Sequence, residues 1–218
     1  LPPADFTFGN ETEIKSIDPA MVTGIPEHRI LDAVFEGLMR PNAETYQPEP
    51  GVAASWEVTE DGRVYTVHLS DDARWSNGEP GTAHDFVFGI RRLLDPVTGA
   101  RYAYQGWFMV GARRYSMGGE GIEAGDPVEV ELNLPAGVPW TRRGRLLRGT
   151  LVAKPAPQVY VVEIAGRQRR FRAGAKQKEP TDETEPCWQV ILDVSDVGIK
   201  AIDDRTLVTT LEIPTPFW

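Results

Sequence analysis

The chain has 218 residues, of which 41% are hydrophobic and 25% are charged, and its formal net charge is −9. This composition is typical of a globular protein. No apolar stretch of the sequence approaches the roughly 18 residues that a bilayer-spanning helix needs, which excludes an integral membrane segment. The one cysteine, Cys187, cannot form an intrachain disulfide, and we expect it to be a small buried hydrophobic residue.

Charge is distributed unevenly along the chain. Residues 141–178 contain eleven lysines and arginines but a single acidic residue, Glu163. So sharp an asymmetry predicts a segment with its own surface. Its basic side chains form either a solvated strand face or a patch that attracts anionic lipid or acidic polymer of the cell envelope.

The N-terminal part predicts a strand followed by a helix. Residues 6–9 form a short extended run. The helix is expected to begin near Pro26, which suits a first turn, and to end near Arg40. Six apolar residues recur at helical spacing and predict one apolar face: Ile30, Leu31, Val34, Phe35, Leu38 and Met39.

After this helix the apolar pattern changes to a period of two. Residues 56–59 and 64–69 alternate around a turn that contains Gly62, which predicts a β-hairpin. A second turn follows, and Thr82 and Asp85 then have the spacing of a capping box. The sequence therefore predicts a second helix that begins there and ends before the next Asp-Pro pair.

From about Pro127 the sequence is rich in short strands. In the first of them, hydrophobic residues alternate with Glu129 and Glu131, so we expect these glutamates to face water. Four or five short strands with tight turns predict a small barrel or sandwich inserted as a unit. Further strands are expected at residues 146–152, 159–164, 168–172 and 188–194, an exposed mobile loop at 176–186, and a final hairpin at 197–213.

Four linked submotifs follow one another: GVAASW (51–56), DGRVYTVHL (61–69), WSNGEP (75–80) and TAHDFV (82–87). Together they resemble the signature of the bacterial family 5 extracellular solute-binding proteins, which include oligopeptide-, dipeptide- and nickel-binding members. Their order and spacing over about forty residues carry the resemblance, and the sequences SIDP (16–19), FEGL (35–38) and VGIKAIDDRTL (197–207) support it.

The resemblance implies an α+β fold: the N-terminal lobe of a clamshell like the type II periplasmic binding proteins, with the small β-barrel or sandwich inserted. Family members are more than twice as long and bind ligand between two lobes, so we expect this chain to be a fragment without the second lobe. The expected parts are residues 1–42, the strand and helix of the main lobe; 43–125 with 195–218, a small subdomain with the signature; and 126–194, the inserted basic module.

The resemblance also implies a function. The protein is expected to capture oligopeptides or a related small polar solute and to deliver them to the permease of an ABC importer. We expect it in the periplasm, or as a lipoprotein on the outer side of the cytoplasmic membrane. The alternative hypothesis is an interaction or scaffold module that binds an envelope component through the basic insert. Nucleic acid is not an expected partner.

Three ligand-binding residues are carried over from peptide-binding relatives. Thr23 and Ile25 match the loop that borders the ligand, although Thr23 stands where some relatives have an acid that pairs with the peptide amine. Tyr102 matches a tyrosine that contacts the peptide backbone. The alternative for Thr23 and Ile25 is that they only shape the entry into the helix. The alternative for Tyr102 is that it is a partly buried residue of the lobe. Trp56 and Trp75, within the signature, are expected to be core residues.

No pattern predicts catalysis, a metal site or a cofactor. His28, His68 and His84 lie on different predicted elements and form no zinc spacing with one cysteine. The carboxylate pair Asp203 and Asp204 has the position of turn residues rather than of an acid/base pair. The sequence therefore predicts a binding protein and not an enzyme.

Overall fold

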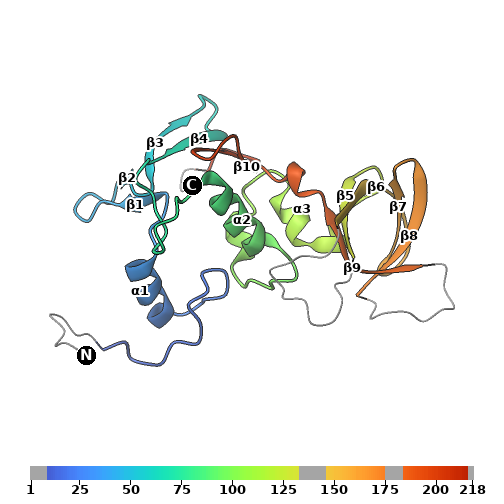
Figure 1. Cartoon of the computed structure of the whole chain (residues 1–218), viewed down its shortest axis with the longest axis horizontal. Helices are drawn as coiled ribbons and strands as arrows, with labels where there is room; N and C mark the ends of the chain where they lie inside the picture. The colour runs from blue at the N-terminus through green and yellow to red at the C-terminus, as the bar shows by residue number, and fades with distance from the viewer. Residues whose placement is uncertain (1–8, 133–145, 175–183, 216–218) are drawn as a thin grey trace.

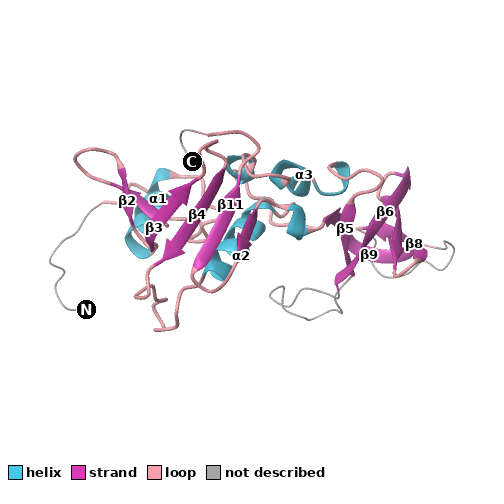
Figure 2. Ribbon diagram, turned by 90° about the horizontal axis from the view of Figure 1, so that it is seen from above, coloured by secondary structure: helices cyan, strands magenta, loops and turns pink. Residues whose placement is uncertain are grey.

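A computed structural model describes residues 9–132, 146–174 and 184–215. It contains a mixed lobe of helices and a sheet and, at the other end of the molecule, a small barrel (Figures 1 and 2). Helices α2 and α3 lie between the sheet and the barrel. The α+β class is confirmed, and of the two architectures expected for the β-rich segment the structure contains a closed barrel.

The first helix is shorter than the sequence predicted. Helix α1 (Ile25–Val34) ends six residues before Arg40, because the following backbone pairs with residues 48–53 instead. The apolar face of the helix is therefore only partly used: Leu31 is buried, whereas the Val34 side chain is 63% exposed. Of the strand expected at residues 6–9, residues 6–8 lie outside the described residues. The pairing strands are β1 (Met39–Pro41) and β2 (Pro48–Pro50).

Both predicted hairpins form and join in one sheet. In the first, Gly62 lies in the turn at φ +68°, as the sequence indicated. The second hairpin pairs Ile199 with Thr209 and packs beside the first through antiparallel pairing of Leu207 with Val67. The strand order is β10-β11-β4-β3, with β3 (Ala53–Val58), β4 (Val64–Leu69), β10 (Ile199–Ala201) and β11 (Thr206–Thr210).

The second helix begins at the predicted cap. Asp85 accepts hydrogen bonds from the Thr82 amide at 2.8 Å and from the Thr82 hydroxyl at 2.9 Å, which fixes the first turn. The indole of Trp75 donates to the same carboxylate at 3.3 Å and is 46% exposed, so the expectation of a core role for Trp75 was wrong. Trp56 is partly buried against the core. The helical elements of this part are α2 (Ala83–Leu94), η1 (Ala103–Gly106), α3 (Ala112–Ser116) and η2 (Gly118–Glu120).

The barrel is closed by five strands that neighbour one another in sequence order. All pairs are antiparallel except β8 with β9, which is parallel. Fully buried side chains such as Leu151, Val162 and Phe171 pack into one cluster, as expected for a barrel too small to hold a ligand inside. The strands are β5 (Pro127–Leu132), β6 (Leu146–Ala156), β7 (Val159–Ile164), β8 (Arg167–Ala173) and β9 (Glu185–Leu192), followed by η3 (Val194–Asp196).

The barrel and the lobe share one hydrophobic core. Leu94 and Tyr115 of the lobe are fully buried in the same cluster as Val128 and Leu192 of the barrel. Cys187 is buried there as expected, and burial raises the pKa of its thiol to about 12. A thiol that is protonated at neutral pH is a poor nucleophile.

The expectation that Glu129 and Glu131 face water was wrong. Both lie on β5 and are buried, Glu129 completely. The alternation of the sequence is real, but the second face of the strand is covered by polar partners rather than by solvent. Arg91 from α2 and Arg148 from β6 bind Glu129, and Gln189 from β9 donates to Glu131 at 3.0 Å.

Candidate functional site

The segment that the resemblance pointed to, residues 16–25, is here called the Asp-Pro loop. Its backbone is organised around Asp18, whose carboxylate accepts a hydrogen bond from the Ala20 amide at 3.1 Å. The Asp18 carbonyl accepts from the amides of Met21 and Val22 at 2.9 and 3.2 Å. Pro19 restricts the backbone at the start of this turn. The sequence thus builds a defined turn that leads directly into α1.

An ion pair attaches the Asp-Pro loop to α2. Arg92, in the last turn of α2, donates from Nη1 to Asp18 Oδ1 at 2.6 Å and from Nη2 to Asp18 Oδ2. Such a two-fold guanidinium–carboxylate contact fixes orientation as well as distance. The Arg92 contact lowers the pKa of the Asp18 carboxyl from its ordinary value of 3.8, with partial burial acting in the opposite direction.

We expect this pair to make the loop sensitive to acid. Because the pKa of Asp18 is lower in the folded than in the unfolded chain, its stabilisation is complete above pH 3.8 and is lost as the pH falls through the folded value. Asp18→Asn should therefore lower the free energy of unfolding by roughly 1–2 kcal/mol at neutral pH. Urea unfolding at neutral pH and at about pH 2 measures this, and an equal loss at both pH values would contradict the assignment.

The three predicted ligand residues lie around this loop. The Tyr102 hydroxyl donates to the Thr23 carbonyl oxygen at 3.4 Å, a long hydrogen bond that joins the two residues across 79 positions of sequence. The Tyr102 ring also meets the Tyr104 ring edge-on, with centroids 6.0 Å apart. Ile25 is the first residue of α1 and is 68% exposed. Thr23 and Tyr102 are thus brought together, and Ile25 lies two residues further along the chain.

Sequence reasoning did not identify three residues that build this site. Asp18 was quoted as part of a motif, but nothing in the sequence showed that its carboxylate binds α2. Arg92 was not distinguished from the neighbouring Arg91 by the helical pattern. Tyr104 carries a signal that could have been used, because it lies two positions after Tyr102 and also combines an apolar ring with a polar hydroxyl.

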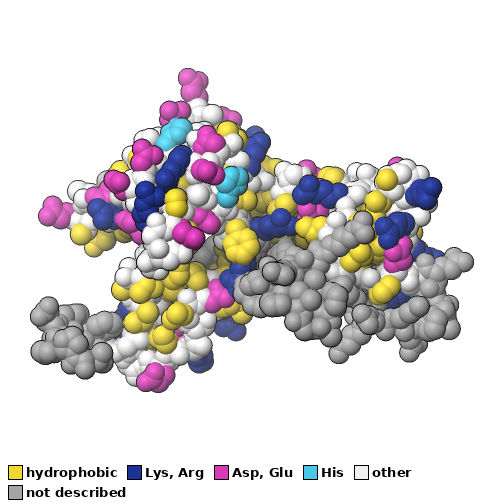
Figure 3. Space-filling model, viewed as in Figure 1, with side chains coloured by type: hydrophobic (Ala, Val, Ile, Leu, Met, Phe, Trp, Pro, Cys, Tyr) yellow, Lys and Arg dark blue, Asp and Glu magenta, His cyan; other side chains and the backbone are white. Residues whose placement is uncertain are grey.

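The surface around the loop is mainly apolar. Hydrophobic side chains gather over the α1 end of the molecule (Figure 3), and those in and beside the loop include the exposed residues Ile17, Met21, Ile25, Val34 and Phe35. The two acids nearest Thr23 in sequence are both engaged, Asp18 with Arg92 and Glu27 with the Lys15 amide at 3.2 Å. The loop therefore offers apolar and hydroxyl contacts rather than a ready carboxylate for an amine.

The basic segment is partly neutralised within the barrel. Arg148 binds Glu129, and Arg169 donates through Nε to Glu185 at 2.7 Å. Lys154 donates to the Ile122 carbonyl oxygen at 2.5 Å. Five more basic residues of the segment lie outside the described residues, namely Arg142, Arg143, Arg145, Lys176 and Lys178. Binding of an anionic envelope component to this segment stays a prediction.

Two further searches covered the described parts of the chain. Within residues 9–132, 146–174 and 184–215, no group of three or more His, Cys, Asp or Glu side chains could hold a metal ion. None of the helices in these same ranges has the length and apolarity needed to cross a membrane.

The sequence is similar to known solute-binding proteins over different lengths. It is 48% identical over 96 residues to the periplasmic oligopeptide-binding protein OppA of Haemophilus influenzae, which is 44% of this chain and 18% of that protein. It is 31% identical over 179 residues to the dipeptide-binding protein DppE of Bacillus subtilis, 82% of this chain and 29% of that protein.

Solved structures of oligopeptide-binding proteins also match this chain. A Haemophilus influenzae OppA complex with the peptide RPPGFSPFR matches with a TM-score of 0.57 and 26% identity, over 95% of this chain and 27% of that one. The substrate-binding domain of an oligopeptide ABC transporter from Bacillus anthracis matches with a TM-score of 0.56 and 27% identity, over 92% and 25%. The chain therefore spans about a quarter of the length of these structures.

One family description covers the larger part of the sequence. Residues 47–186 match the family described as bacterial extracellular solute-binding proteins, family 5, middle part. The matched range contains all four submotifs quoted above, together with the capped helix α2 and most of the barrel. The chain belongs to the family 5 bacterial extracellular solute-binding proteins.

Proposed function

We propose that this chain is part of the solute-binding component of an ABC importer, which captures oligopeptides or a related small polar solute. The observation that carries the proposal is the family match over residues 47–186. Relatives named as periplasmic oligopeptide- and dipeptide-binding proteins support it. The component works outside the cytoplasmic membrane and delivers its solute to the permease, so its task is transport rather than catalysis.

The Asp-Pro loop and Tyr102 form the ligand-facing part of this chain in the proposal. Solute-binding clamshells gain affinity by enclosing the ligand, so that backbone and aromatic groups replace water. Here the Tyr102 and Tyr104 rings supply aromatic groups, and the exposed backbone of the loop at Thr23 supplies polar ones. The exposed Ile25 and Met21 add apolar surface for peptide side chains.

The proposed parts of the chain remain those expected from sequence. Residues 1–42 belong to the main lobe, residues 43–125 with 195–218 form the subdomain that carries the signature, and residues 126–194 are the inserted module. The sheet supports the second of these parts, because β4 precedes the barrel segment in the sequence, β11 follows it, and the two strands pair with each other.

Peptide binding by the 218-residue chain can be tested by nuclear magnetic resonance. Titration with RPPGFSPFR, the peptide bound to the Haemophilus influenzae relative, is expected to shift amide resonances of the Asp-Pro loop and of residues around Tyr102. Because this chain spans about a quarter of that structure, the affinity should be weak, with a dissociation constant of about 1 mM or more. Tyr102→Ala should weaken it at least about threefold, since one aromatic contact is lost.

The matched control is Tyr46→Ala. Tyr46 is exposed, whereas Tyr102 is partly buried, and Tyr46 lies in the turn between β1 and β2 rather than in the Asp-Pro loop, so its removal should leave the titration unchanged. Shifts that appear on the barrel rather than at the loop, or equal losses in both variants, would count against the ligand assignment. Tight binding at micromolar concentrations would instead contradict the need for enclosure by a second lobe.

A further inference from the structure

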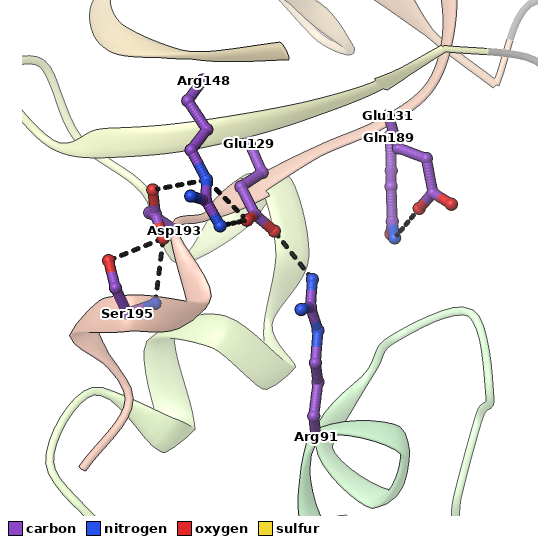
Figure 4. A network of polar contacts seen from close by, with 7 residues as sticks. All are labelled: Arg91, Glu129, Glu131, Arg148, Gln189, Asp193 and Ser195. Atoms are coloured by element: carbon purple, nitrogen blue, oxygen red, sulfur yellow. Dashed lines mark hydrogen bonds and ion pairs between the residues drawn. The ribbon is translucent and has the colours of Figure 1, made fainter. Parts of the chain in front are cut away.

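The barrel and the lobe meet at a completely buried carboxylate. Arg91, in the last turn of α2, donates through Nη2 to Glu129 Oε2 at 2.8 Å. From the other side Arg148 donates to Glu129 Oε1, at 3.0 Å from Nη2 and 3.2 Å from Nε (Figure 4). A buried charge needs such partners, because its loss of hydration is otherwise uncompensated. The position of Arg91 on α2 therefore constrains where β5 can lie.

The contact extends to the point where the chain leaves the barrel. Arg148 Nε lies 3.4 Å from Asp193 Oδ2. The other oxygen of Asp193 accepts from the amide and the hydroxyl of Ser195 at 2.9 and 2.7 Å (Figure 4). These four charged residues, Arg91, Glu129, Arg148 and Asp193, are called the junction network. It ties α2 to the entry strand, a neighbouring strand and the exit of the barrel.

The next residue of α2 holds the Asp-Pro loop. Arg92 binds Asp18 with both of its terminal nitrogens, whereas Arg91 binds Glu129. Consecutive residues of an α-helix point about 100° apart, so one turn can serve two partners on different sides. Two cations in the last turn are also favourable at the negative end of the helix dipole.

We propose that the last turn of α2 couples the barrel to the Asp-Pro loop. Arg91 is a positioning residue: it fixes this turn against Glu129, and the fixed turn presents Arg92 to Asp18. Loosening the junction network then loosens the Asp18 anchor. The loop's role in ligand binding rests on the proposed function, but the coupling itself concerns contacts that exist without ligand.

Hydrogen exchange on the whole chain without ligand tests the coupling. The variants are Arg91→Met, which leaves Glu129 its contact with Arg148, and Glu129→Gln. Both should speed exchange of the Ala20, Met21 and Val22 amides by roughly three- to tenfold, because these amides depend on Asp18. Exchange in β4 should speed by a smaller factor than exchange in the loop, because the β4 amides report only the loss of global stability. Arg91→Lys keeps the charge and should restore slow exchange in the loop.

Glu185→Gln is the matched control. It removes a partly exposed carboxylate of β9 that binds Arg169 of β8 rather than a residue of α2, so the loop should exchange at the wild-type rate. Unchanged loop exchange in Arg91→Met, while Asp18→Asn speeds it, would overturn the proposal. Loop exchange that speeds by no more than exchange in β4 would also overturn it, because that result reports only a general loss of stability. No outcome depends on peptide binding, which the titration above tests separately.

Discussion

Glu129→Ala is expected to lower the free energy of unfolding by about 3–5 kcal/mol. The substitution removes a carboxylate with no solvent exposure and leaves Arg91, whose side chain is largely buried, facing a gap without its acceptor. Loss of one member of a buried ion pair costs more than the pair itself contributes, because the remaining charge keeps its desolvation cost. Urea unfolding followed by tryptophan fluorescence and by circular dichroism measures the loss.

The comparison for this prediction is Glu185→Ala. Glu185 also binds an arginine through two contacts, but its side chain is about half exposed, so water replaces the lost partner. That variant should lose no more than about 1 kcal/mol. Equal losses in the two variants would show that burial of Glu129 contributes nothing.

Phe171→Ala is expected to cost about 3–5 kcal/mol, the usual penalty for truncating a fully buried aromatic ring. Phe171 lies on β8 opposite Tyr160 of β7 and belongs to the core that barrel and lobe share. The variant also removes the ring over which the Arg169 guanidinium lies at 5.1 Å. Because the core is shared, thermal unfolding of the lobe and of the barrel should both move to lower temperature.

Val152→Ala provides the control within the same barrel. Val152 lies on β6 and is exposed, so its truncation should change stability by less than about 1 kcal/mol. A Phe171→Ala protein in which the lobe keeps its melting temperature would contradict the shared core.

Local signals predicted most of the fold. The hairpin at Gly62, the capped start of α2 and the strands of the barrel all depend on neighbouring residues, so the sequence displays them directly. The end of α1 was missed because pairing of β1 with β2 overrides helical periodicity. The register that places β11 beside β4 depends on residues about 140 positions apart, and the sequence did not predict it; the family resemblance indicated only that the two segments belong to one subdomain.

The acids Glu129 and Asp18 show why the ion pairs of the junction network and of the Asp-Pro loop were not predicted. Glu129 alternates with valines in the same way as a solvated strand residue, and its partner Arg91 lies 38 positions earlier. Asp18 and Arg92 are 74 positions apart. Periodicity reports whether a face is apolar, but it does not report which charged side chain covers a polar face. Thr23 and Tyr102 were predicted as ligand residues only because the resemblance supplied them.

The parallel pair that closes the barrel has a consequence for the order of folding. Five strands cannot form a ring in which every neighbour is antiparallel, so one parallel seam is required, and here it lies between β8 and β9. The last strand then returns beside the first, through pairs such as Val128 with Leu192. Assembly of the barrel therefore brings residues 127 and 192 together and shortens the loop that must close before β11 meets β4. A barrel that forms first would lower the entropic cost of pairing β11 with β4.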